Sequence, residues 1–336
     1  MNNKERFFAS LTLKEVDRVS VACPLQTGTV EQMEETNAFW PEAHYDPQQM
    51  AKLALAAPTL TGIESVRVPF DLCVEAETLG SVVNRGRIDI QPSIEEPVLK
   101  DLEKIDELEH PDPEKDGRMS MVVEAIRLLS KETSSLPIIG GITGPFTLAG
   151  QLRGVEALLM DLYDNPDIVR KLLRFSQEVL TLYGKALESN GADGILIIDP
   201  SAGSELLGKK HYEEVAFPYC SGLVESLSSP TILHICGDSK PILDLMVKTG
   251  VDGVSLDHLV DIKDAKKIIG NRASIIGNIN PTGTLFLGDP EKIRKEVREC
   301  IRKGVNILAP GCGIPPRTKL ENIRAMVEAA KKSENK

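Results

Sequence analysis

The sequence predicts an α/β fold of the (β/α)8 TIM barrel type, and two observations support this prediction. Eight short runs along the 336-residue chain are rich in valine and isoleucine and apolar on both faces, as buried parallel strands are. Helical segments lie between most of these runs, and the alternation of strands with helices is typical of a parallel sheet. Because periodicity does not show whether such a sheet closes, a doubly wound open sheet is the alternative.

The predicted strands and helices alternate from residue 20 to the last part of the chain. The strands span residues 20–23, 65–68, 138–142, 194–198, 231–235, 253–256, 273–276 and 306–308. The clearest helices span residues 47–57, 116–133, 165–190, 211–228, 240–249, 262–269 and 290–303. A last helix, residues 320–332, follows the eighth strand and completes the alternation.

Two segments depart from a bare barrel. Residues 1–18 are predicted to form a short N-terminal helical arm, and residues 75–100 an inserted hairpin. The hairpin would pair residues 79–83 with residues 87–91 around an Asn-Arg-Gly turn. No linker, repeat or low-complexity tract divides the chain, so we expect residues 1–336 to form a single catalytic domain.

Composition limits the possible functions. The formal net charge of −11 argues against nucleic acid as the main partner. No apolar run reaches the roughly 18–20 residues of a membrane span, and the N-terminus does not resemble a signal peptide. We therefore expect a cytoplasmic protein with no membrane segment. Six scattered cysteines are too few for a disulfide scaffold and are expected to be free thiols.

Three side chains of metal-ligand type are predicted to meet at one end of the barrel. His234 and Cys236 end the fifth predicted strand, and their spacing points both side chains to the same side. Cys312 follows the eighth strand between two glycines. One imidazole and two thiolates suit Zn²⁺, and three protein ligands leave a fourth position where a thiol substrate can become a thiolate. The alternative is a buried core histidine with two cysteines that act as small apolar residues.

Two aspartates follow other predicted strands at the same end, where the active site of a (β/α)8 barrel lies. Asp257 follows the sixth strand, and we expect it to be a displaceable oxygen ligand when no thiol is bound. Its neighbour His258 is expected either behind the ligands or on the surface. Asp199 follows the fourth strand and would either orient a ligand or cap the turn after its strand. Asp257 and Asp199 are thus the predicted catalytic residues.

At these residues the chain resembles the uroporphyrinogen decarboxylase superfamily, and within it the methylcobamide:coenzyme M methyltransferases of methylotrophic methanogens. The resemblance runs almost from end to end and is carried by residues 6–11, 40–44, 66–69, 233–237 and 308–314. The paired His-x-Cys and Gly-Cys-Gly segments are specific to the methyltransferase branch.

The resemblance implies a TIM barrel of the uroporphyrinogen decarboxylase type in which His234, Cys236 and Cys312 hold zinc, and zinc binds the thiol of coenzyme M. The acidic fourth ligand of the family is often Glu, whereas the matching position here is Asp257, which is one methylene shorter. The methyl donor would be a methylated corrinoid, a methylcobamide. We expect a separate corrinoid protein to carry it, because no corrinoid-attachment motif of the Asp-x-His-x-x-Gly kind occurs in this chain.

Three functions remain open. The first is zinc-dependent methyl transfer to coenzyme M or a similar small thiol, and the second uses the same donor with another acceptor, such as tetrahydrofolate. The third is a divergent decarboxylase, but that branch binds its polycarboxylate through arginines after the first strand, and no arginine lies between Arg18 and Arg67. The residues that could meet a sulfonate from the predicted mouth loops are Arg153, Lys209, Lys210 and Arg317.

Overall fold

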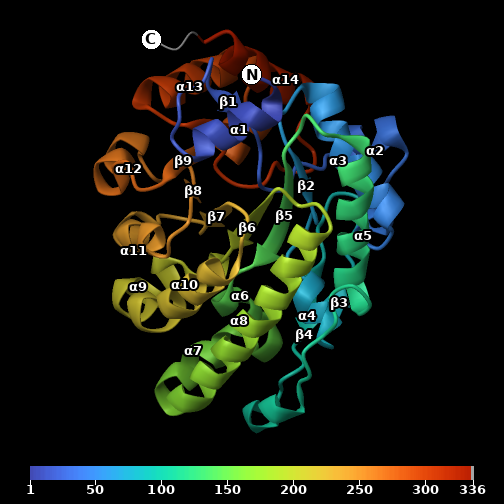
Figure 1. Ribbon diagram of the computed structural model, residues 1–336, viewed down its shortest axis with the longest axis vertical. Helices are drawn as coiled ribbons and strands as arrows, with labels where there is room; N and C mark the ends of the chain where they lie inside the picture. Colours follow the sequence, from blue (N-terminus) through green and yellow to red (C-terminus); the bar gives the residue numbers. More distant parts are fainter. Residues whose placement is uncertain (334–336) are drawn as a thin grey trace.

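Eight parallel strands form one curled sheet in the computed structural model, which describes residues 1–333 (Figure 1). Their order is β1-β10-β9-β8-β7-β6-β5-β2, without the reversal of strand order that defines a doubly wound sheet. All eight overlap the predicted strands, so the TIM barrel type is confirmed. The strands are β1 (Ser20–Val21), β2 (Val66–Val68), β5 (Ile138–Thr143), β6 (Gly194–Ile198), β7 (Thr231–His234), β8 (Gly253–Ser255), β9 (Ser274–Ile279) and β10 (Ile307–Pro310).

The end strands of this sheet, β1 and β2, are joined through the residues beside them. The backbone N–H of Glu64 donates to the carbonyl oxygen of Val21 at 2.8 Å. The buried Glu64 carboxylate accepts a hydrogen bond from the Val21 N–H at 3.1 Å. Further along the two strands, the Cys23 N–H donates to the Ser65 hydroxyl at 3.0 Å. These contacts bring the first and last strands of the sheet together and complete the ring.

Helices follow nearly every strand, and those described are not long and apolar enough to span a membrane. Helix α6 escaped the sequence prediction because it is buried on almost all sides and lacks the polar face of an amphipathic helix. The helices are α1 (Asn3–Leu11), α2 (Val30–Thr36), α3 (Pro47–Thr61), α4 (Val74–Thr78), α5 (Gly117–Glu132), α6 (Pro145–Arg153), α7 (Val155–Asp164), α8 (Pro166–Ser189), α9 (Ser204–His211), α10 (Phe217–Ser226), α11 (Leu243–Lys248), α12 (Ile262–Ile269), α13 (Pro290–Lys303) and α14 (Leu320–Lys331).

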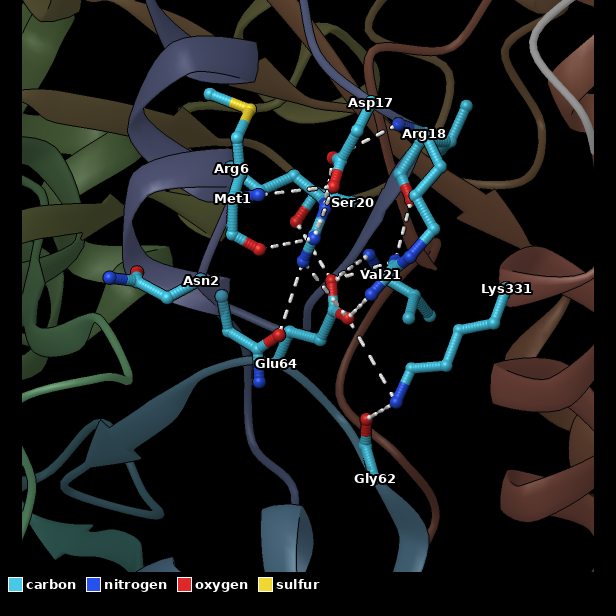
Figure 2. A network of polar contacts seen from close by, with 12 residues as sticks. Met1, Asn2, Arg6, Asp17, Arg18, Ser20, Val21, Gly62, Glu64 and Lys331 are labelled. Atoms are coloured by element: carbon cyan, nitrogen blue, oxygen red, sulfur yellow. Dashed lines mark hydrogen bonds and ion pairs between the residues drawn. The ribbon is translucent and has the colours of Figure 1, made fainter.

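Three cations surround the buried Glu64 carboxylate beside β2 (Figure 2). Arg18 forms an ion pair with it, and Arg6 Nη1 and Lys331 Nζ lie 3.6 Å and 3.9 Å from its Oε1. Arg6, on the N-terminal arm, also donates to Asp17 at 2.7 Å. We call Glu64, Arg6, Arg18 and Lys331 the Glu64 clasp. It ties α1 and the end of α14 to the start of β2.

The inserted hairpin lies inside the predicted segment 75–100 but uses different residues. β3 (Val82–Asn84) pairs antiparallel with β4 (Ser93–Glu96) at the end of the molecule away from the termini (Figure 1). The prediction of a strand at residues 87–91 is wrong. A tight turn closes there instead, with the Arg87 N–H donating to the Ile90 carbonyl oxygen at 2.9 Å.

Candidate metal centre and active site

His234, Cys236 and Cys312 come together at the carboxyl ends of β7 and β10. Their ligand atoms all lie within 4.8 Å of one another. Cys236 Sγ is 3.3 Å from His234 Nε2 and 4.0 Å from Cys312 Sγ. Zinc–sulfur bonds of about 2.3 Å and zinc–nitrogen bonds of about 2.0 Å place tetrahedral neighbours roughly 3.5–3.8 Å apart. The three donor atoms therefore fit three corners of a tetrahedral metal site, and the predicted meeting of these three residues is confirmed. Their role as metal ligands stays a prediction.

The His234 ring is held so that one nitrogen faces the two sulfurs. The ring is fully buried, and its Nδ1 lies 3.1 Å from both the carbonyl oxygen and the hydroxyl of Ser255, the last residue of β8. Because a carbonyl oxygen only accepts hydrogen bonds, we assign the ring proton to Nδ1. The Nε2 lone pair is then free for a metal, and the contact with Ser255 fixes the ring in the orientation that a ligand needs.

The two cysteines lie within hydrogen-bonding distance of each other, and this contact shifts the pKa values of their thiols in opposite directions. The hydrogen bond from Cys236, assisted by His234, lowers the pKa of Cys312 to about 4. The same hydrogen bond, together with burial, raises the pKa of Cys236. A divalent cation can displace the thiol protons and hold both sulfurs as thiolates. All six cysteines are free thiols, as expected, and burial raises the pKa of each of the other four.

Asp257 lies beside this ligand set but is tied to the backbone. Its Oδ2 accepts a hydrogen bond from the Gly237 N–H at 3.1 Å, and its Oδ1 accepts one from the Leu259 N–H at 3.0 Å. His258 Nδ1 lies 2.8 Å from the same Oδ1, and its ring is half-buried. Asp257 thus anchors the loop that carries Cys236. Its role as a displaceable oxygen ligand stays a prediction.

Asp199 holds the start of α6. Its Oδ1 accepts hydrogen bonds from the Thr147 N–H at 2.7 Å and from the Thr147 hydroxyl at 2.6 Å. Burial raises the pKa of Asp199 to about 6. A Cβ at Gly144 would lie 2.2 Å from the Asp199 Cγ, so the close packing of β6 against α6 requires glycine there. Asp199 therefore supports α6, the helix after the neighbouring strand β5, and its side chain does not cap the turn after its own strand β6. Its role in orienting a ligand stays a prediction.

A cavity of about 210 Å³ opens onto the three candidate ligands. Three polar side chains besides the candidate ligands line it, namely Gln26, Arg67 and Gln91. The rest of the wall is mainly apolar and comes from Leu25, Phe70, Leu72, Ile198, Ile314, Pro315 and Pro316. A cavity of this size suits a small substrate with an apolar middle section.

The four predicted mouth cations do not line this cavity. Arg153 Nε pairs with Asp161 at 2.8 Å, and Arg317 Nε pairs with Asp89 at 2.8 Å. The cation that does line the cavity is Arg67, in the middle of β2. Sequence reasoning missed it, although one signal was present. Arg67 is the only charged residue in the predicted strand 65–68.

Comparison with known proteins extends over nearly the whole chain. Residues 2–333 match the family model for uroporphyrinogen decarboxylase (URO-D). The chain is 43% identical to methylcobamide:CoM methyltransferase MtbA of Methanosarcina acetivorans, over 98% of this chain and 97% of that protein. It is 39% identical to methylcobamide:CoM methyltransferase MtaA of Methanosarcina barkeri, over 97% and 96% of the two chains.

A solved structure agrees with these sequence relatives. The methyltransferase from Methanosarcina mazei superposes with a TM-score of 0.95 at 37% identity, over 99% of both chains. The chain therefore belongs to the uroporphyrinogen decarboxylase family, in its methylcobamide:CoM methyltransferase branch.

Proposed function

We propose that this protein transfers a methyl group from a methylated corrinoid to the thiol of coenzyme M, with zinc at His234, Cys236 and Cys312. The observation that carries the proposal is the set of one imidazole and two sulfurs, which faces a small cavity at the barrel mouth. The names of the relatives supply the donor and the acceptor. We further propose that a separate corrinoid protein delivers the donor, and we expect this to happen in the cytoplasm.

The donor set fits zinc better than a harder cation. Thiolate and imidazole ligands favour Zn²⁺, whereas Mg²⁺ and Ca²⁺ prefer oxygen. When bound, zinc supplies the Lewis acidity that lowers the pKa of a substrate thiol, while two thiolate ligands keep that sulfur nucleophilic. Cys236 and Cys312 provide those two thiolates. Ser255 keeps His234 oriented as the third donor.

The proposed methyl transfer needs no added oxidant or reductant. The substrate thiol gives up its proton to solvent, and its sulfur then attacks the methyl carbon of methyl-Co(III). A carbon–sulfur bond forms, the cobalt–carbon bond breaks, and the electron pair of that bond stays on cobalt as Co(I). The chain contributes by orienting the sulfur and by surrounding it with apolar walls, which exclude competing water.

The test is spectroscopic. The zinc-loaded protein, with methylcobalamin and coenzyme M under anaerobic conditions, should convert the methylcobalamin spectrum to that of Co(I) cobalamin while methyl-coenzyme M accumulates. A parallel reaction supplies tetrahydrofolate in place of the thiol. If methylcobalamin is demethylated with tetrahydrofolate but not with any thiol, the proposal is contradicted and the second function is supported instead.

A further inference from the structure

Arg67 is a buried cation that lacks a counter-ion. It is 1% exposed, and its Nε and Nη2 have no hydrogen-bond partner among residues 1–333. Burial lowers the pKa of Arg67 to about 10, so the guanidinium still carries its charge at neutral pH. Buried charges are normally paired, because leaving one unpaired costs several kcal/mol. An anion from outside the chain would supply the missing partner.

The nearby carboxylates are already engaged elsewhere. Asp71 and Glu75 attract Arg67 through space, but neither forms an ion pair with it. Asp71 Oδ2 instead binds Arg118 Nη2 at 2.5 Å. Glu75 Oε1 accepts a hydrogen bond from the Thr143 N–H at 2.8 Å, and burial raises the pKa of Glu75 to about 7. Neither carboxylate therefore serves as the counter-ion of Arg67.

The guanidinium lies in a place that the backbone keeps open for it. A Cβ at Gly141, in the neighbouring strand β5, would lie 2.5 Å from Arg67 Nη2 and 2.7 Å from Nε. Only glycine allows the side chain to lie across β5 in this way. The adjacent Gly140 faces the other side of the strand, where its Cβ would approach Leu187 at 3.0 Å.

The same cavity thus offers two different binding groups. One is the sulfur and imidazole ligand set, the other is the guanidinium of Arg67, and apolar residues such as Phe70 and Ile198 form the wall they share. A complementary ligand carries a thiol and an anionic oxygen group joined by a short apolar chain. Arginine donates two parallel hydrogen bonds to such an oxyanion.

We infer that Arg67 is the anion-binding residue of this cavity, and that it receives the acidic group of the thiol substrate and so directs the thiol to the metal centre. The inference rests on the proposed function and deepens it. It states that the enzyme selects thiols that carry a sulfonate or carboxylate group. Arg67, a residue of β2, makes this selection.

The test compares two thiols that differ only in the acid. The ratio of kcat/KM for coenzyme M, which is 2-mercaptoethanesulfonate, to kcat/KM for 2-mercaptoethanol measures the contribution of the anion. In Arg67→Met this ratio should fall about 10- to 100-fold, because a charged hydrogen-bonding pair is lost. Gly141→Ala keeps the charge but displaces the guanidinium, and it should lower the ratio in the same direction. Gly140→Ala, the same change one residue away, should leave the ratio at the wild-type value.

A second measurement does not depend on methyl transfer. Ethanesulfonate has the acid and no thiol, so it should raise the thermal unfolding midpoint of the wild-type holoenzyme and of Gly140→Ala, but not that of Gly141→Ala. Equal stabilisation of all three would overturn the inference, as would an unchanged thiol ratio in Gly141→Ala. If the wild type demethylates methylcobalamin with neither thiol, the proposed function fails, and the ethanesulfonate shift still decides whether the cavity binds anions.

Discussion

Two buried charges lie three residues apart near β2, and their surroundings differ. Glu64 is fully buried, and the three cations of the Glu64 clasp surround it. Arg67 is 1% exposed and has no ion pair among residues 1–333. The charge of Glu64 is compensated within the chain, and the contacts of this residue join β1 to β2. The charge of Arg67 is compensated only when a ligand arrives.

The same contrast separates the two ends of the barrel. At the amino end, polar groups beside β1 and β2 find their partners within the protein. At the carboxyl end, the Sγ atoms of Cys236 and Cys312 lie 4.0 Å apart, and both residues line a cavity. A cluster whose partners are incomplete is costly for folding alone, so it indicates where a metal or substrate binds. The predictions below test this contrast.

The largest expected effect comes from the two cysteines at the carboxyl end of the barrel, Cys236 and Cys312. Cys236→Ala and Cys312→Ala should each lose zinc and at least roughly 1,000-fold in kcat/KM, because several kcal/mol of metal assistance disappear. Metal analysis and the methylcobalamin assay measure both losses. Cys300→Ala removes a buried thiol of α13 and serves as the matched control, which should keep full zinc and turnover. Full zinc in either site variant would show that the ligand set is wrong.

The next effect is on the free energy of unfolding, and it compares the two buried charges, Glu64 and Arg67. Glu64→Gln leaves the cations of the clasp uncompensated and should lower the free energy of unfolding by about 3–5 kcal/mol. Arg67→Met removes a charge without a partner and should leave the free energy of unfolding equal or higher. Urea denaturation of both variants makes the comparison. An Arg67→Met variant as unstable as Glu64→Gln would mean that Arg67 serves the fold.

A smaller effect concerns the orientation of His234. Ser255→Ala removes one of the two acceptors at Nδ1 while the carbonyl oxygen remains. We expect zinc affinity to fall about 10-fold, the lower end for such supporting groups. Competition with a chelator measures it. Ser274→Ala is the control, because the hydroxyl of Ser274 is buried and has no partner among the described residues. Equal affinities in the two variants would count against the assigned orientation.

The last effect is a pH dependence from Glu75. Burial raises its pKa from the usual 4.5 to about 7. Between these values the native protein holds a proton that the unfolded chain has released, so the free energy of unfolding should fall as pH rises through this window. Glu75→Gln should flatten that slope, because the amide oxygen still accepts from Thr143 and no longer titrates. An unchanged slope in urea titrations from pH 4.5 to 7 would contradict the assignment.

The sequence predicted the fold and the convergence of the three candidate ligands, because both depend on local patterns. Apolar runs predicted all eight strands, and strand ends placed His234, Cys236 and Cys312 at one mouth. The hairpin was misplaced because its pairing depends on the turn closed by Arg87 and Ile90, which alternation along the chain does not show.

Arg67 could not be identified from the sequence, since its role depends on what is absent around it. Whether a buried arginine has a partner is a property of the packed barrel. Here Asp71 already forms an ion pair with Arg118. The cations of the predicted mouth loops looked more suitable, yet Arg153 and Arg317 pair with aspartates. The contact of Asp199 with Thr147, which lies in the helix after a different strand, likewise depends on the packed barrel.

X-ray absorption at the zinc edge tests the central claim most directly. The resting holoenzyme should show zinc with two sulfur ligands and a remainder of nitrogen and oxygen, including the oxygen predicted from Asp257. Adding coenzyme M should raise the sulfur count to three as the substrate thiol takes the open position. A sulfur count that stays at two in the presence of saturating coenzyme M would contradict thiol binding at this centre.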